Sequence, residues 1–199
     1  MLSTLDRFKK RSFDIVFSIV GIGLTWWLMF VAWLIATIET KSNGLFMQKR
    51  IGREGRSFWV FKIKTMKAVD GIDTTVTTST DRRITQSGLF FRKTKIDELP
   101  QLFNVLLGSM SFVGPRPDVS GFADKLEGKD RVILEICPGI TGPASLKYKD
   151  EEEILAKQKD PERYNKEVIW PDKVEINKTY IKEWSLKKDI GYIMKTILG

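Results

Sequence analysis

The longest apolar run in the chain covers residues 15–38, which include no charged side chain. A continuous helix over this run would be roughly 36 Å long, enough to cross the apolar part of a bilayer. The residues before it mix basic and apolar side chains, a pattern typical of a segment that lies at a membrane surface. The pattern predicts an amphipathic lead-in and membrane anchor over residues 1–40 and a compact domain over residues 41–199.

Basic side chains flank the apolar run on both sides, with Lys9–Arg11 before it and Lys41 and further cations after it. Because basic flanks favour the cytoplasmic side of a membrane, a single span would place one of the two groups outside. Trp26 and Trp27, which prefer interfacial depth, lie at the middle of the run. Both observations favour a re-entrant helix over a spanning helix, with its bend at residues 21–25.

After the anchor, the pattern predicts one small β-hairpin over residues 45–66. In the second arm, Ser57–Met66, successive side chains would alternate between two faces, one of which carries Lys62 and Lys64. Residues 52–55 form a turn signal that separates this arm from residues 45–51.

The rest of the pattern is mainly helical. An apolar helical pattern follows Pro100 and ends at Gly108, and a charged segment predicts a solvated helix broken at Pro161. Residues 138–143, rich in Pro and Gly, predict a stiff loop. The expected fold class is α+β, mainly helical, with an N-terminal re-entrant membrane helix and a compact cytoplasmic domain that carries the hairpin. The expected helices lie at 101–107, 149–167, 173–184 and 190–198.

The net charge of +8 is concentrated near the start of the chain. Residues 1–67 hold 12 Lys and Arg against 4 acidic residues, whereas the remainder holds 21 of each. A basic excess beside an apolar run favours anionic lipid headgroups as partners and disfavours nucleic acid. Histidine is absent from the sequence, which excludes imidazole bases, Ser-His-Asp triads and most zinc sites. Acid–base or nucleophilic chemistry must therefore come from carboxylates, Lys, Tyr, Ser or Thr.

Two adjacent carboxylates, Asp97 and Glu98, precede the helical pattern at 101–107, and a group of cations that includes Arg92 lies just upstream. Two explanations stay open at this point. A helix start with free backbone N–H groups, acidic side chains and nearby cations is suited to hold a phosphorylated substrate, with or without a divalent metal. Alternatively, Asp97 only caps the helix and Glu98 complements its dipole, which is the commoner reason for such a pair.

Two further cations are candidates for phosphate contacts. Lys62 shares one face of the second hairpin arm with Lys64, and Arg116 lies between Pro115 and Pro117, whose rings restrict the backbone. The alternatives are a solvated strand face for Lys62 and a plain surface turn for Arg116.

Several separated stretches share the motifs of one known family, in family order and over nearly the whole chain. They are Lys10-Arg11 with Asp14, Gln48–Gly52, Phe61–Met66, Asp81–Thr85, Asp97–Leu102, Gly114–Pro117 and Pro138–Gly142. Together they resemble the bacterial sugar transferase family, the monotopic polyprenyl-phosphate phosphoglycosyl transferases, in its minimal form with the catalytic domain alone. Each stretch is a weak signal, whereas the ordered set is highly specific. Trp26-Trp27 stands about where that family has a Ser-Pro pair.

The resemblance implies a phosphoglycosyl transferase that moves a sugar 1-phosphate from a UDP-sugar to polyprenyl (undecaprenyl) phosphate, at the cytoplasmic face of the bacterial inner membrane. By this resemblance Asp97 attacks the sugar-bearing phosphorus and holds a covalent phospho-sugar while UMP leaves, and Mg²⁺ binds near Asp97. Glu98 assists the attack by the lipid phosphate and the placement of the metal. The residues implied for substrate phosphates are Arg92, Arg116 and, more weakly, Lys62. Those assigned to the membrane anchor are Lys10, Arg11, Asp14, Trp26 and Trp27.

A non-catalytic, membrane-tethered scaffold is the alternative function, in which the carboxylate pair is only a helix cap. A nucleic-acid binder is disfavoured because charge is balanced after residue 67. The motifs mark the phosphate chemistry and leave the sugar, the glycan pathway and the oligomeric state open.

Overall fold

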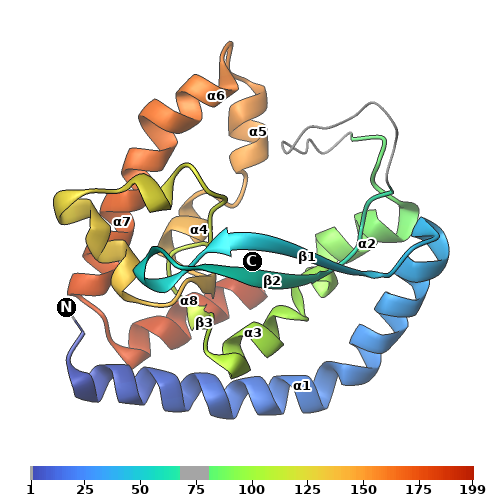
Figure 1. Cartoon of the computed structure of the whole chain (residues 1–199), viewed down its shortest axis with the longest axis horizontal. Coiled ribbons are helices and arrows are strands. Elements are labelled where there is room, and N and C mark those ends of the chain that lie inside the picture. Colours follow the sequence, from blue (N-terminus) through green and yellow to red (C-terminus); the bar gives the residue numbers. More distant parts are fainter. Residues whose placement is uncertain (1, 68–80) are drawn as a thin grey trace.

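The computed structural model describes residues 2–67 and 81–199, and their architecture is mostly helical around one small hairpin. Figure 1 shows the long helix α1 (Thr4–Thr40) running along one edge of the domain and curving towards the hairpin, which crosses the centre. The later α-helices are α2 (Gln86–Thr94), α3 (Gln101–Leu107), α4 (Pro143–Lys147), α5 (Glu151–Ala156), α6 (Pro161–Tyr164), α7 (Trp170–Lys182) and α8 (Leu186–Leu198).

Helix α1 joins the predicted lead-in and the apolar run into one unbroken helix. Its start is fixed by a capping box, in which the Ser3 side chain accepts from the Asp6 N–H and Asp6 reaches back to Ser3. The helix continues through Trp26 and Trp27 without a break. Within the stretch where a bend was expected, the Thr25 hydroxyl donates to the Gly21 carbonyl at 2.7 Å. Such a bond weakens the helical ladder locally and favours curvature over a sharp kink.

The two faces of α1 differ in composition. Apart from Met29, the buried stripe consists of small or polar residues at helical spacing, such as Ser18 and Ala32, whereas large apolar side chains such as Leu24 and Phe30 are exposed on the opposite side. Among the described residues, α1 is the one helix long and apolar enough to cross a membrane by length and composition, with a mean hydropathy of 2.2 in its most apolar window. An apolar face of this extent in water marks a surface that meets lipid or protein.

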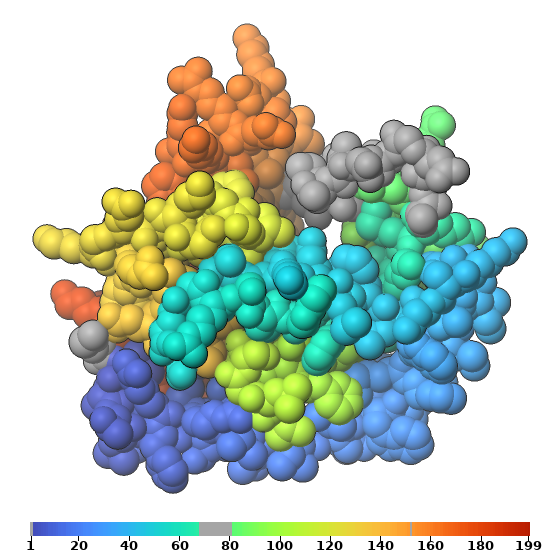
Figure 2. Space-filling model, in the orientation of Figure 1, coloured from blue at the N-terminus to red at the C-terminus, as the bar shows by residue number. Residues whose placement is uncertain are grey.

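The predicted hairpin is confirmed as β1 (Leu45–Ile51) paired antiparallel with β2 (Ser57–Ile63). Its turn uses the left-handed conformation at Glu54 and Gly55, with φ of 61° and 76°. Helix α3 is fastened beneath β2 by Asn104, whose side chain accepts from the Phe61 N–H and donates to the Trp59 carbonyl at 3.0 and 2.7 Å. Figure 2 shows α3 lying between α1 and the hairpin on one face of the molecule.

The stiff loop predicted for residues 138–143 is wrong in part, because Gly139–Thr141 forms strand β4. It pairs in parallel with β3 (Ser111–Val113), which immediately precedes the Arg116 loop. A side chain at Gly139 would place its Cβ 2.1 Å from the Gly114 nitrogen, so two glycine backbones meet there. Local pattern does not reveal such pairing, since the partners lie far apart in the sequence.

The break predicted at Pro161 in the charged segment is confirmed, because α5 ends at Ala156 and α6 begins at Pro161. The second part then continues through a π turn (Asn165–Ile169) into α7, which the pattern did not predict. Proline is favoured in a first turn, where its missing N–H has no intrahelical partner. The predicted helices near the C-terminus are confirmed as α7 and α8.

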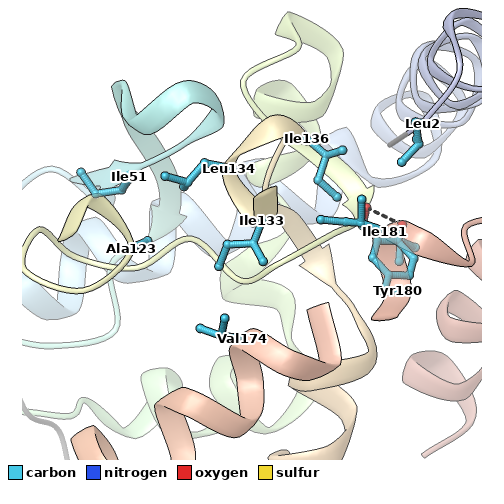
Figure 3. Packing of buried hydrophobic residues seen from close by; sticks show 10 residues of the cluster. Leu2, Ile51, Ala123, Ile133, Leu134, Ile136, Val174, Tyr180 and Ile181 are labelled. Atoms are coloured by element: carbon cyan, nitrogen blue, oxygen red, sulfur yellow. Dashed lines mark hydrogen bonds between the residues drawn. The ribbon is translucent and has the colours of Figure 1, made fainter. Parts of the chain in front are cut away.

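The largest core cluster joins α7 to the 3₁₀ segment Gly128–Glu135 and to β3 (Figure 3). Ile133, Leu134 and Val174 pack there, and the Tyr180 hydroxyl oxygen lies 3.3 Å from the Val113 carbonyl oxygen. The core therefore lies against the strand that leads into the Arg116 loop.

A buried ion pair attaches α1 to α8. The Lys10 ammonium lies 2.6 Å from the Asp189 carboxylate, and both side chains are almost fully excluded from solvent. Tyr180 and Trp184 donate to the same carboxylate at 2.7 and 3.0 Å. A buried charge pair is stable only when its remaining hydrogen-bonding capacity is used, and this network uses it.

Candidate active site

Asp97 and Glu98 lie in a single 3₁₀ turn, η2 (Ile96–Glu98), between α2 and α3. The chain enters this turn through Lys95, which has a left-handed φ of 59°. Ile96 packs against buried residues of α1, β2 and α2, so the turn is held close to α1. This arrangement brings the acidic pair next to the long apolar helix.

The alternative explanation, in which Asp97 caps the helix, is wrong. Helix α3 begins at Gln101 with Pro100 in the cap position, and neither α3 nor the 3₁₀ turn has a side-chain cap hydrogen bond. Asp97 is buried, and its Oδ1 atom has no hydrogen-bond partner among the described residues. A buried carboxylate oxygen without a partner is costly and marks a site prepared for another group.

Burial is the main cause of a raised pKa at Asp97, and the adjacent Glu98 carboxylate raises it further. Lys62, Lys95 and Arg92 act in the opposite direction through their positive charges. Desolvation and opposing charges of this kind are typical of functional carboxylates.

Glu98 is held by two cations from distant segments. Its Oε1 atom lies 3.1 Å from the Lys62 ammonium and 3.6 Å from the Arg116 guanidinium, and its side chain is 13% exposed. Burial acts to raise the pKa of Glu98, but Lys62, Arg116 and Lys95 outweigh burial and lower that pKa to about 2. Glu98 therefore stays ionised across the physiological range.

The structure thus brings together four of the five predicted site residues, namely Asp97, Glu98, Lys62 and Arg116. The fifth, Arg92, lies nearby. Arg92 does not contact either carboxylate; its Nε donates to the Thr65 hydroxyl at 3.1 Å, and it acts on Asp97 through its charge. Lys95 lowers the pKa of both carboxylates and was missing from the predicted site set, although its position two residues before Asp97 was a usable signal. The Lys64 ammonium donates to the Ser42 hydroxyl at 2.8 Å, whereas the Lys62 ammonium pairs with Glu98.

The acidic pair fits a magnesium ion only in part. Among the described residues, no group of three or more His, Cys, Asp or Glu side chains forms a closed cage for a metal. Mg²⁺ commonly takes one or two carboxylates together with substrate phosphates, and the unpartnered Asp97 oxygen is such a ligand. The donor set therefore suits a metal that arrives with a phosphorylated substrate.

The residues assigned to the membrane anchor separate into two groups. Lys10, Arg11 and Asp14 point into the protein: the Arg11 guanidinium donates to carbonyls at the end of α3, and Asp14 accepts from the Ser111 hydroxyl and the Phe112 N–H. Trp26 and Trp27 point outward and are 61% and 56% exposed. The basic motif before the apolar run thus joins α1 to the domain, and the tryptophans lie on the exposed apolar face.

The chain is similar to several proteins that are named as undecaprenyl-phosphate sugar phosphate transferases. A Bacillus subtilis (strain 168) protein, provisionally named an undecaprenyl-phosphate N-acetylgalactosaminyl 1-phosphate transferase, is 34% identical over 148 residues, which is 71% of this chain and 79% of that protein. The UDP-glucose:undecaprenyl-phosphate glucose-1-phosphate transferase of Escherichia coli (strain K12) is 33% identical over 98% of this chain and 41% of its own length. The UDP-N-acetylgalactosamine-undecaprenyl-phosphate N-acetylgalactosaminephosphotransferase of Aeromonas hydrophila is 32% identical over 98% of this chain and 44% of its own length.

The chain thus spans less than half of the Escherichia coli and Aeromonas hydrophila relatives. Two of the three names specify N-acetylgalactosamine and one specifies glucose. The bacterial sugar transferase family matches residues 5–199, which include nearly all of α1, the hairpin and the acidic pair. Since this match extends over nearly the whole sequence, the chain belongs to the bacterial sugar transferase family.

Proposed function

We propose that this protein is a phosphoglycosyl transferase that moves a sugar 1-phosphate from a UDP-sugar to undecaprenyl phosphate through a phospho-sugar aspartate at Asp97. The observation that carries the proposal is the buried Asp97 carboxylate, whose Oδ1 atom has no partner among the described residues, beside the cation-held Glu98 in a member of this family. The names of the relatives, which combine UDP-sugars with undecaprenyl phosphate, support the substrate classes.

In the first step, an Asp97 carboxylate oxygen attacks the phosphorus that carries the sugar. A new bond forms between this oxygen and phosphorus, the bond from phosphorus to the bridging oxygen breaks, and UMP leaves with that oxygen. In the second step, an oxygen of undecaprenyl phosphate attacks the same phosphorus and the Asp97 carboxylate is released. A carboxylate is an adequate relay for phosphoryl groups and requires no histidine.

The cations around the pair have a defined task in this chemistry. Every partner is an anion, so the guanidinium of Arg116 and the ammonium of Lys62 offset repulsion, and Arg92 adds its charge at Asp97. Mg²⁺, with Asp97 as its protein ligand, supplies further charge neutralisation at the phosphates when bound. Glu98 is assigned to assist the lipid phosphate and orient these cations.

The same proposal includes a membrane geometry, in which α1 enters and leaves the bilayer from the cytoplasmic face. Two contacts support it: near the start of α1 Lys10 binds Asp189, and near its end Glu39 accepts from Ser87. A helix that spanned the bilayer would have to leave the polar domain at one of these ends. The exposed apolar face between the contacts then lies in lipid, with Trp26 and Trp27 on it.

The geometry is tested with single cysteines placed at Ser3 and Ser42 in a Cys137→Ser background, because Cys137 is the one native cysteine. We expect a membrane-impermeant maleimide to leave both positions unlabelled in intact spheroplasts and to label both after permeabilisation. Labelling of one position from outside and the other from inside would refute the geometry.

The activity is tested by measuring UMP release from a panel of UDP-sugars, with the full chain in detergent or nanodiscs, Mg²⁺ and undecaprenyl phosphate. We expect release with one or a few of the sugars, and lipid-linked sugar phosphate as the second product. A folded protein that releases no UMP from any UDP-sugar would contradict the proposal and would favour the alternative function, a membrane-tethered scaffold.

A further inference from the structure

Gln48 and Arg50 form a polar pair on the hairpin that the proposed chemistry does not use. They are two residues apart on β1, so they share one face with Lys62, whose partner across the hairpin is Phe46. Both are half-buried, whereas Lys49 between them is exposed and lies over the Trp59 ring at 5.3 Å. The pair therefore faces the active-site side of the hairpin.

The guanidinium of Arg50 is held at three nitrogens. Its Nε and Nη2 donate to the Gln48 Oε1 atom at 3.1 and 2.7 Å, and its Nη1 donates to the Pro117 carbonyl at 3.4 Å. The neighbouring Ile51 N–H donates to the Asp118 carbonyl at 2.9 Å. Strand β1 therefore fastens the backbone immediately after Arg116.

The backbone before Arg116 is fastened independently. The Gly114 N–H donates to the Thr141 carbonyl at 2.9 Å, and the Gly139 N–H donates to the Pro115 carbonyl at 2.8 Å. With both flanks held, the Arg116 side chain reaches Glu98 while about half of its surface, 51%, stays exposed to solvent. Such a pre-organised guanidinium binds an anion at a low entropic cost.

The electrostatics of this region match a positioning role. Burial first, and then the positive charge of Arg116, lower the pKa of Arg50, whereas Asp118 acts to raise it. Burial raises the pKa of Asp118 to about 6, although Lys173, Arg116 and Arg50 act against that rise. A half-buried guanidinium beside a like charge is unfavourable, and the bonds to Gln48 and Pro117 keep it there.

We propose that Gln48 and Arg50 are positioning residues that hold the Arg116 loop in the geometry that binds the diphosphate of the nucleotide-sugar. The inference rests on the proposed function, since it names the part of the chain that sets one of its phosphate contacts. Arg50 acts through Arg116, and its planar fork rather than its charge is what the loop requires.

The test measures UDP affinity by calorimetry and kcat/KM for UMP release in the full chain. Lysine at position 50 keeps the charge but cannot make the three bonds, so we expect Arg50→Lys and Gln48→Ala each to lower UDP affinity and kcat/KM about tenfold. Lys49→Ala, an exposed neighbour on the opposite face, is the matched control and is expected to match the wild type. Thermal unfolding of each variant checks that it folds.

A double-mutant cycle separates positioning from an independent charge effect. Because Arg50 acts only through Arg116, Arg50→Lys combined with Arg116→Ala is expected to bind UDP no more weakly than Arg116→Ala alone. Additive losses, or an Arg50→Lys protein with wild-type affinity, would overturn the inference while the wild type still binds UDP and releases UMP. A wild type that neither binds UDP nor releases UMP contradicts the proposed function and the inference that rests on it.

Discussion

Replacing Asp97 with asparagine is expected to lower the rate of UMP release by at least ~10³-fold, because an amide has the same shape but is not a nucleophile for phosphorus. Stability is expected to be unchanged or slightly higher, since Oδ1 has no hydrogen-bond partner to lose and the buried charge disappears. The wild type, incubated with radiolabelled UDP-sugar and no lipid acceptor, is expected to retain labelled sugar phosphate. The Asp97→Asn variant retains none.

Asp124→Asn is the matched control, because it makes the same chemical change at an acid that accepts hydrogen bonds from Ser120 and Gly121 in its own loop. It is expected to turn over as the wild type does. Near-normal UMP release by Asp97→Asn would contradict the assignment of the nucleophile and would favour the scaffold function.

The raised pKa of Asp97 adds a pH dependence to this prediction. Since burial and then the Glu98 charge favour the protonated form, the carboxylate forms at a higher pH than for an ordinary aspartate. The nucleophile is the ionised form, so wild-type kcat/KM is expected to fall as pH decreases through this raised pKa. Glu98, with its pKa lowered to about 2, does not contribute to that fall.

The second large effect is expected at Lys10, where Lys10→Met should lower the free energy of unfolding by about 3–5 kcal/mol. The substitution keeps most of the side-chain volume but leaves the buried Asp189 carboxylate without its cation. It also removes a direct attachment of α1 to α8. The change is measured by chemical unfolding of the full chain in detergent.

Lys9→Met is the matched control, because Lys9 is the exposed neighbour and its loss is expected to change stability by less than about 0.5 kcal/mol. Combining Lys10→Met with Asp189→Leu removes both charges and is expected to recover most of the lost stability. A Lys10→Met protein as stable as the wild type would show that the ion pair contributes nothing net to attachment.

Local features of the chain accounted for the hairpin, for α3 ending at Gly108 and for the apolar helix. Each depends on side-chain periodicity or on turn residues, which act between near neighbours in the sequence. The strand pattern made Lys62 a candidate and the two flanking prolines made Arg116 a candidate, and both contact Glu98 in the fold. Strand β4 was missed because it pairs with β3, which lies far away in the chain.

Other outcomes depended on how separate segments meet. The sequence alone made Asp97 a plausible cap, and it became a buried carboxylate without a cap bond because a 3₁₀ turn intervenes before α3. Lys10 and Arg11 looked suited to lipid headgroups, yet the fold turns them inward to α8 and α3. Whether a charge meets solvent, lipid or a buried partner is set by residues as distant as the 179 positions between Lys10 and Asp189, and such contacts leave no trace in local pattern.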